Sequence, residues 1–511
     1  MGYPIVITCD RTMASEYHGL LFLGFSACLP TGVLPDLLYY PLFCPSARHR
    51  KGRLVCAPYG IRKIEAALIR AGIPAEEIIV AHPAHINRVV SKETEVLLVS
   101  SNDPLGMGPA TSTFTELWGG EGRMAQKLRH LLTAKSIQKQ RPKVILGGPG
   151  AWQFSVYPEE QKRLGIDTVI TGEGEHSVVN LVASLRSVPS QSPPPVVAGE
   201  YVPNEDIPDI VHPAITGLVE VTRGCARSCD FCVPTVRRVR SRPMESILRE
   251  TQVNLRENTG VLLHGEDILL YNSDGLKVNG PAVVSLFENI MKVPGVSWSG
   301  ASHASLSSVV QSPETITGIQ KALKWGTREH PGGYFQVGIE TGSPRLIGTH
   351  MKGKVYPYAP KEWPEVVVQG MKILHEHSIF ASATLILGLP GEEEEDIRAT
   401  IDLIEKIAPY GSIIVPLLFT SMETSKLAGT TSLTLDKLTP SHYELLEKCW
   451  LHNLRWLPVI WDLYSHASPW AIRQTIRGAM RMGSPFVAWK IRRWARKRGV
   501  PAGVYKNSRN S

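Results

Sequence analysis

The chain has 511 residues, of which 43% are hydrophobic, and a formal net charge of +8. This length allows two or three domains with sizeable cores. No apolar run is long enough and free enough of charge to span a bilayer. Met1 is not followed by the basic and apolar regions of a signal peptide. We therefore expect neither a membrane-spanning segment nor a signal peptide.

Residues 1–187 alternate between strand-like and helix-like patterns, which predicts a doubly wound α/β domain, Rossmann-like, with a parallel sheet. The expected elements are a short strand in the segment IVIT, helix Ile61–Ala71, and strands Ile78–Val80, Glu95–Ser100, Val144–Leu146 and Thr168–Thr171. The last three strands end in loops rich in Gly, Pro, Ser or Asn. Ligands of open parallel sheets bind beyond the carboxyl ends of the strands, so these loops are the candidate site.

Two segments depart from this regular pattern. The stretch from Cys9 to Pro30 mixes polar and aromatic residues and could cover the ligand of this domain or contact a substrate. Residues 188–213 are rich in Pro and Ser, which is typical of a surface linker. The first four cysteines, at positions 9, 28, 44 and 56, are spaced too irregularly for a metal signature, so buried thiols are expected.

The most informative stretch is VEVTRGCARSCDFC, which places Cys225, Cys229 and Cys232 in the spacing C-x3-C-x2-C. Val219 and Val221 share one face of a short strand, so the cysteine loop is expected at the carboxyl end of that strand. Three thiolates this close can hold three irons of a cubane iron–sulfur cluster and leave the fourth iron open. A structural zinc site would need a fourth ligand, and no further cysteine lies nearby.

This spacing, together with a Phe before the last cysteine, resembles the radical S-adenosylmethionine (SAM) superfamily. The resemblance implies a [4Fe–4S] cluster whose open iron is chelated by SAM. It also implies an external electron donor, because an electron from the cluster splits SAM into methionine and a 5′-deoxyadenosyl radical. A chain that carries such a cluster is expected in a reducing cytoplasm rather than in an oxidising compartment.

Residues 214–425 predict a partial (β/α)6 barrel, with a helix over Met244–Asn258 and a second over Glu395–Ile407. The expected strands are Val261–Leu263, Val296–Trp298, Tyr334–Ile339 and Thr384–Leu387. The turns after three of these strands resemble SAM-binding turns of the superfamily. The resemblance implies that Glu266 or Asp267 holds the SAM amino group, that Glu340 contacts SAM or an adjacent polar group, and that backbone around Ile386 and Gly388 meets the adenine.

The order APYG…SSNDPLG…LGGPGAW…TGEGE in the first domain resembles the cobalamin-binding domain of class B radical SAM methyltransferases. The resemblance implies that the loops after the fourth and fifth expected strands line the nucleotide tail of cobalamin. These residues are Gly147, Gly148, Gly172, Glu173 and Gly174. An ordinary doubly wound domain with tight turns is the alternative.

The motif Asp-x-His-x-x-Gly, which supplies a histidine ligand to cobalt in many cobalamin proteins, is missing from the sequence. The resemblance therefore implies cobalamin with its base displaced and no such histidine below the cobalt. Asn102 or Asp103 could approach that lower face, but a role in the turn is the favoured interpretation for either residue.

Residues 426–511 predict a helical domain, and the stretch from Arg473 to Arg509 contains many basic residues and no acidic ones. Such a stretch is usually a solvated helical face. It can also bind nucleic acid, a membrane surface or an acidic protein, and the sequence does not decide among these.

Together these features resemble a methyltransferase that modifies an unactivated carbon, with one SAM methylating cobalamin and a second generating the radical. The segment TCDRTMASEYHG is similar to that of a methanogen family that methylates the α carbon of a glutamine in methyl-coenzyme M reductase. That resemblance implies a protein partner, the reductase alpha subunit, and neither a membrane nor a nucleic acid. No catalytic side chain is assigned.

Three alternatives remain open. Methylases of tryptophan or of an antibiotic precursor share the same layout. A tRNA methylthiotransferase also carries C-x3-C-x2-C, but it would use a second cluster on three upstream cysteines and a small C-terminal barrel. A cobalamin sensor without enzymatic activity would not explain the cysteine loop.

Overall fold

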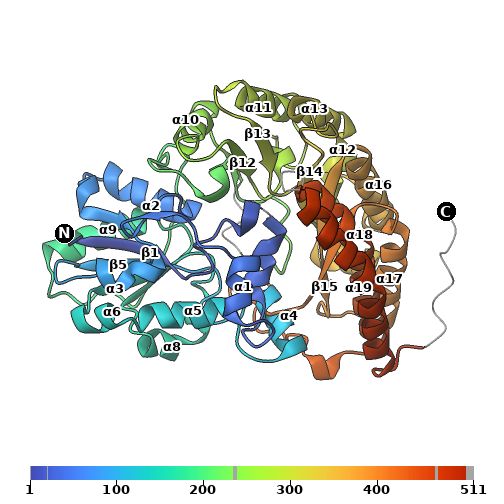
Figure 1. The fold of residues 1–511 in the computed structure, drawn as a ribbon, viewed down its shortest axis with the longest axis horizontal. Helices are drawn as coiled ribbons and strands as arrows, with labels where there is room; N and C mark the ends of the chain where they lie inside the picture. The colour runs from blue at the N-terminus through green and yellow to red at the C-terminus, as the bar shows by residue number, and fades with distance from the viewer. Residues whose placement is uncertain (1, 20, 234–238, 466–469, 502–511) are drawn as a thin grey trace.

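The computed structural model describes residues 2–19, 21–233, 239–465 and 470–501. Figure 1 shows an N-terminal α/β unit on one side, a curved barrel of strands and helices on the other, and two long C-terminal helices along the barrel. Within the described part of the chain, none of the helices combines the length and apolarity needed to cross a membrane. Residues 502–511 of the expected basic stretch lie outside the described residues.

A six-stranded parallel sheet with the order β4-β1-β5-β6-β7-β8 forms the centre of the N-terminal unit. Its strands are β1 (Ile5–Cys9), β4 (Ile78–Val80), β5 (Val96–Ser100), β6 (Lys143–Gly147), β7 (Thr168–Thr171) and β8 (Val196–Ala198). The sheet has a hydrophobic cluster on each face, one under α2 (Tyr59–Arg70) and α9 (Glu175–Ser187) and the other under α5 (Arg123–Leu132). This confirms the doubly wound fold, whose strand order reverses between β1 and β5, the usual place of a ligand site.

The segment expected to be a linker is tied to the protein rather than free. Strand β8 lies within residues 188–213 and pairs in parallel with β7. Farther along, Arg62 Nε donates to the Pro213 carbonyl at 2.9 Å, and Lys63 Nζ donates to the Pro208 carbonyl at 2.6 Å. Composition indicates a surface segment but does not reveal these bonds, because they use backbone atoms.

Six parallel strands follow one another around the barrel. They are β9 (Leu218–Glu220), β12 (Gly260–His264), β13 (Trp298–Ala301), β14 (Gly333–Glu340), β15 (Ile379–Leu387) and β16 (Ser412–Leu418). The first three and the last three form separate ladders. A parallel bridge between His303 and Gln336 joins the two ladders. In this bridge the Gln336 N–H donates to the Ser302 carbonyl at 2.9 Å. The predicted partial barrel is confirmed.

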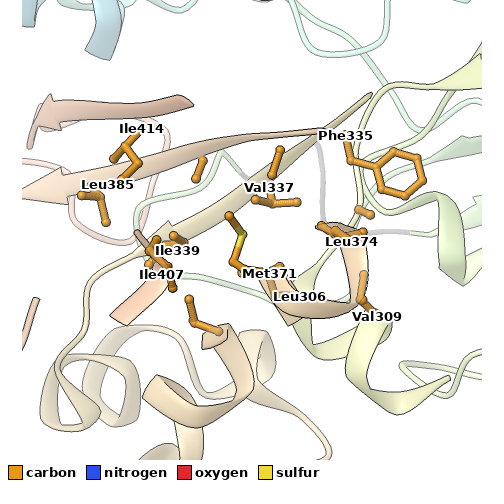
Figure 2. Packing of buried hydrophobic residues seen from close by; sticks show 14 of the residues in the cluster. Leu306, Val309, Phe335, Val337, Ile339, Met371, Leu374, Leu385, Ile407 and Ile414 are labelled. Carbon is orange, nitrogen blue, oxygen red and sulfur yellow. The ribbon is translucent and has the colours of Figure 1, made fainter. Parts of the chain in front are cut away.

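Helices pack on the outside of these strands. They include α10 (Met244–Asn254), α11 (Gly280–Lys292), α13 (Pro313–Leu323), α16 (Trp363–Glu376) and α17 (Glu394–Ile407). Figure 2 shows the core between strands and helices, where Phe335, Val337 and Ile339 of β14 approach Met371 and Leu374 of α16. Because side chains alternate along a strand, the intervening residues of β14 face the barrel lumen.

Two helices, α18 (Pro440–Tyr464) and α19 (Trp470–Arg496), make up the C-terminal region. α18 covers β16, where the Asn453 side chain bonds both the N–H and the carbonyl of Ile414 at 2.7 Å each. The Asn453 side chain thus satisfies backbone groups of β16, which is the last strand of the ladder β14-β15-β16. The predicted helical region is therefore an integral part of the barrel wall.

The N-terminal unit and the barrel are joined by buried contacts between α2 and α10. Glu250 of α10 accepts from Lys63 Nζ at 2.5 Å and from the Tyr59 hydroxyl at 2.7 Å. On the other side of the barrel, Leu418 N–H at the end of β16 donates to Thr113 Oγ1 of helix α4 (Pro109–Trp118) at 2.8 Å. The carboxyl ends of the N-terminal sheet thus face the carboxyl ends of the barrel strands.

Candidate cofactor site

The cysteine loop lies at the carboxyl end of the first barrel strand, as predicted. Two residues with positive φ, Gly224 at 91° and Ser228 at 53°, bend the chain within the cysteine loop. Cys229 is buried, while Cys225 and Cys232 are partly exposed. The Cys232 N–H donates to the Cys229 carbonyl at 3.1 Å, which closes the last turn of the loop.

The electrostatic surroundings favour a thiolate at the centre of this loop. A hydrogen bond from Cys232 lowers the pKa of Cys229 to about 7, and the Lys354 ammonium acts in the same direction. Burial raises the pKa of Cys225, and the hydrogen bond shared with Cys229 raises the pKa of Cys232. Because metal ligation by cysteine requires the thiolate, the cation beside Cys229 and Cys232 suits a ligand loop.

Arg227, inside the cysteine motif, fixes the loop to the barrel. Its guanidinium donates to Asp267 Oδ2 at 2.9 Å and to Ser308 Oγ at 2.6 Å. It also reaches the carbonyls of Gly353 and Lys354 at 3.0 and 3.1 Å. A fifth hydrogen bond runs to Ser307 Oγ at 2.9 Å. These five hydrogen bonds hold the Arg227 side chain, which is only 5% exposed.

The donor set fits an iron–sulfur cubane held by three thiolates. Among the residues the structure describes, no three His, Cys, Asp or Glu side chains converge on the position of a single metal ion. A cubane carries its thiolates on separate iron atoms, so it does not require such convergence. The braced loop and the neighbouring ammonium of Lys354 are consistent with an anionic cluster at this place.

Glu340, expected to contact SAM or an adjacent polar group, lies at the end of β14 in a left-handed conformation with φ 64°. Its carboxylate accepts from Lys354 Nζ at 2.9 Å and from Thr384 Oγ1 at 3.2 Å. A Cβ atom on Gly338 would come within 2.0 Å of Glu340 Oε1 and 2.6 Å of Lys354 Nζ. Glycine at position 338 therefore leaves room for the Glu340–Lys354 ion pair beside the cysteine loop. The left-handed backbone of Glu340 is strained, which is typical of a functional position.

The other residues expected near SAM have distinct surroundings. Asp267 is buried and already accepts from Arg227, Ser308 and a backbone N–H, so its carboxylate braces the loop. Glu266 is exposed and is the carboxylate of this turn that remains accessible to a ligand amine.

The turn after β15, the fifth strand of the barrel, contains the backbone that was expected to meet the adenine. Ile386 pairs with Leu417 in the ladder. Gly388 has φ 79°, and its N–H donates to Glu392 Oε2 at 2.7 Å. A Cβ atom on Gly388 would lie 2.5 Å from the Leu433 side chain, so the turn requires glycine. The Gly388 N–H is thus engaged in a hydrogen bond, as are the carbonyls of Leu387, Leu389, Pro390 and Gly391.

A cavity of about 330 Å³ lies at the carboxyl ends of β5, β6 and β7. All five loop residues predicted to line a cobalamin tail border it: Gly147, Gly148, Gly172, Glu173 and Gly174. Its deeper wall is formed by aliphatic residues: Ile7, Ile61, Ile64, Leu98, Ile145, Ile170 and Val178. An apolar floor with a backbone-lined mouth suits a flat heterocyclic base.

Glycine is required at two positions that border this cavity. Gly148 has φ 103°, and a Cβ atom there would lie 2.7 Å from the Ser101 carbonyl oxygen. Gly172 has φ 83°. By contrast, a Cβ atom on Gly174 would meet nothing closer than 3.6 Å. The backbone cradle depends on the first two residues.

Asn102 and Asp103, the candidates for the lower face of cobalamin, follow β5. Asn102 is exposed. Asp103 is buried, and its Oδ1 accepts from the Gly108 N–H at 2.9 Å and from Gln153 Nε2 at 2.6 Å. Asp103 Oδ2 is buried without a hydrogen-bond partner among the described residues. Asp103 thus shapes the turn, and neither Asn102 nor Asp103 is among the residues that border the cavity.

The cysteines of the N-terminal unit are buried free thiols, as expected. Cys9 and Cys28 belong to different hydrophobic clusters. Burial raises the pKa of Cys9 and Cys56, and raises that of Cys28 to about 12. These surroundings favour packed thiols over ligands of a second cluster.

Comparison with known proteins identifies the central part of the chain. Residues 219–404 match the Radical SAM superfamily. The match covers the cysteine loop and the barrel strands β12 to β15. A radical SAM domain uses a [4Fe–4S] cluster and SAM, which agrees with the cysteine loop described above.

Curated relatives include tRNA-modifying enzymes and a ribosomal protein methylthiotransferase. The chain is 24% identical over 290 residues to threonylcarbamoyladenosine tRNA methylthiotransferase MtaB of Thermotoga maritima, covering 55% of this chain and 60% of that protein. It is 26% identical over 284 residues to tRNA-2-methylthio-N(6)-dimethylallyladenosine synthase of Sulfurihydrogenibium sp., covering 53% and 60%. The chain thus spans about three-fifths of the length of these curated relatives.

Among solved structures, the fold is similar to that of the radical SAM methyltransferase TsrM from Kitasatospora setae. One TsrM structure, with tryptophan and a SAM analogue bound, has a TM-score of 0.55 at 15% identity and covers 83% of this chain and 75% of that chain. A second, with cobalamin and a [4Fe–4S] cluster bound, has a TM-score of 0.54 at 14% identity. The likeness extends beyond the barrel and supports the predicted arrangement of an α/β unit, a radical SAM barrel and further helices.

Proposed function

We propose that this chain is a cobalamin-dependent radical SAM C-methyltransferase. The observation that carries the proposal is the cavity of about 330 Å³ in the N-terminal unit, which is shared with the barrel. Its wall includes Glu220 and Arg223 of the barrel, and Arg223 is followed two residues later by Cys225. A base-binding cavity thus opens beside the cysteine loop. When bound, the cluster and SAM supply a carbon radical, and cobalamin supplies a transferable methyl group.

In this proposal the residues of the chain hold and align the groups. Cys225, Cys229 and Cys232 ligate the cluster, and Arg227 with Asp267 keeps the loop in place. Glu340 and Lys354 set the charge beside the loop. Gly147, Gly148, Gly172 and Gly174 offer backbone to the cofactor tail, Asn102 faces its corrin end, and Glu266, Ile386 and Gly388 border SAM. An external donor supplies the electron.

We further propose a protein substrate, the α carbon of a glutamine in the methyl-coenzyme M reductase alpha subunit. The support is the resemblance of the segment Thr8–Gly19. Helix α19 adds an exposed face that suits a protein partner, with Met482, Phe486 and Trp489 exposed by 79%, 57% and 51%. Methylation of tryptophan is a second candidate, favoured by the fold of TsrM, whose structure holds tryptophan.

A tRNA methylthiotransferase is the third candidate, favoured by the curated relatives. Two features oppose it. The N-terminal thiols are buried in separate surroundings, and the described C-terminal region is a pair of helices instead of a small barrel. The many Arg and Lys residues of α19 would suit RNA. The chemical identity of the product therefore decides between the candidate functions.

Incubation of candidate substrates with SAM carrying a CD3 methyl group tests the proposal. We expect the purified, anaerobically reconstituted protein to add one CD3 group at carbon, read by tandem mass spectrometry, and to release 5′-deoxyadenosine. Addition of a sulfur atom together with the methyl group would show a methylthiotransferase. A CD3 product formed without 5′-deoxyadenosine would overturn the radical mechanism.

A further inference from the structure

A charged network joins the N-terminal cavity to the cysteine loop, and Arg223 is at its centre. Strand β10 (Thr222–Arg223) pairs antiparallel with β11 (Arg240–Ser241) just before the loop. The Arg223 guanidinium donates to both carboxylate oxygens of Glu220, at 2.8 and 2.9 Å. It also contacts Glu173 Oε2 at 3.0 Å and Glu175 Oε1 at 2.8 Å.

The two glutamates from the N-terminal unit belong to the turn that borders the cavity. Glu173 and Glu175 flank Gly174 in the sequence, and all three residues line the cavity wall. Glu173 Oε2 further accepts from the Val202 N–H at 3.1 Å and pairs with Arg240 of β11. The turn is therefore tied to both strands of the short hairpin that leads into the loop.

The network is largely shielded from water. The Arg223 side chain is 16% exposed, and those of Glu173 and Glu175 are 14% and 7% exposed. A charge pair in such surroundings is costly to break from one side, because the remaining charge keeps its desolvation penalty. The guanidinium holds a bidentate partner at the end of β9 and two partners on the turn, so the turn and β10 are expected to move together.

We propose that Arg223 couples occupancy of the N-terminal cavity to the conformation of the cysteine loop. A ligand that orders the Glu173–Glu175 turn fixes Arg223, and Arg223 fixes the backbone that begins the loop two residues before Cys225. Such coupling is reciprocal, since each site must affect the other by the same factor. This inference rests on the proposed function, and Arg223 is a positioning residue in it.

The coupling is measured as the ratio of two dissociation constants for hydroxocobalamin. The full-length protein is titrated anaerobically by absorbance, once free of cluster and once reconstituted with it. We expect the wild type to bind at least about fivefold more tightly with the cluster, in the usual range of coupling between sites. In Arg223→Gln we expect this ratio to fall to about one. A matched control is Arg249→Gln, because Arg249 pairs with Asp209 on the barrel surface and is 61% exposed.

Hydrogen exchange gives a second readout that does not need activity. In the wild type without cluster, hydroxocobalamin is expected to slow exchange in peptides covering residues 219–233, and in Arg223→Gln it is expected not to. If Arg223→Gln fails to fold, Glu175→Gln removes one of the three carboxylates from the opposite side and should lower the ratio in the same direction.

The outcomes separate the two proposals. Wild-type protein that binds no hydroxocobalamin in either state overturns the proposed function and this inference with it. Wild-type protein that binds it equally in both states, or an Arg223→Gln variant that keeps the wild-type ratio, overturns the inference and leaves the proposed function standing. A lowered ratio in both Arg223→Gln and Arg249→Gln also overturns the specific role of Arg223.

Discussion

Removing the charge of Asp267 while keeping its shape tests whether the cysteine loop is held by a buried ion pair. Asp267 and Arg227 are 3% and 5% exposed, with 2.9 Å between Oδ2 and Nη2. Breaking a buried pair from one side costs about 3–5 kcal/mol. Arg227 keeps four neutral acceptors on Ser307, Ser308, Gly353 and Lys354. We therefore expect Asp267→Asn to lose about 3 kcal/mol, the lower end of that range.

The assay is urea denaturation of the cluster-free protein, followed by tryptophan fluorescence, together with iron and sulfide quantitation after reconstitution. Asp206→Asn serves as the control, because Asp206 is 40% exposed and lies 3.6 Å from Arg70. An exposed pair of this kind contributes about 0–1 kcal/mol. Equal losses in the two variants, with full cluster loading of Asp267→Asn, would refute the bracing role of the pair.

Three further predictions concern charge, space and pH. Lys354→Met removes the cation beside the cysteines, so the midpoint potential of the cluster should become more negative by at least about 40 mV, equivalent to about 1 kcal/mol of lost attraction, in an EPR-monitored titration. Gly148→Ala places a Cβ atom 2.7 Å from the Ser101 carbonyl at a left-handed φ, so hydroxocobalamin should bind at least about tenfold more weakly. Gly174→Ala, which meets nothing closer than 3.6 Å, should bind as the wild type does, and equal affinities in both variants would contradict the cradle. Burial raises the pKa of Asp10 from 3.8 to about 6, so ionisation opposes folding and stability is lost as pH rises from about 4 to 6. Asp10→Asn should be more stable than the wild type by about 3 kcal/mol at pH 7 and equal to it near pH 3, and a difference independent of pH would exclude this cause.

Much of the fold could be predicted from hydrophobic patterning, because buried parallel strands form short apolar runs. Strands β4 and β7 begin and end where the sequence analysis placed them. Strand β13 begins later than expected, at Trp298, and continues through Ser299 and Gly300, which carry little hydrophobic signal. Strand β16 was not anticipated, because Pro416 interrupts the run SIIVPLL. A proline is tolerated there because β16 is paired with only one strand, β15, within the described sheet.

The sequence predicted those parts of the candidate site that a local motif defines. It did not predict the ion pairs between residues that are distant in the sequence. The three cysteines and the glycine turns are visible as spacing and composition. Arg227 lies within the cysteine motif, but its partner Asp267 is 40 positions away in the sequence. Lys354 pairs with Glu340, which is 14 positions away. Glu173 was expected to line the cofactor cavity and does border it, but its carboxylate is directed to Arg223 and Arg240. Such pairings follow from tertiary structure, which composition does not encode.

The central claim is that a cluster with one open iron and a corrin are bound by the same chain. Iron, sulfide and cobalamin are therefore to be quantified on anaerobically purified protein, for the wild type and for Cys229→Ala. We predict about four irons and one cobalamin per wild-type chain, and loss of the cluster with loss of 5′-deoxyadenosine formation in Cys229→Ala. About eight irons without cobalamin, or a Cys229→Ala variant that still assembles a full cluster, would contradict the account.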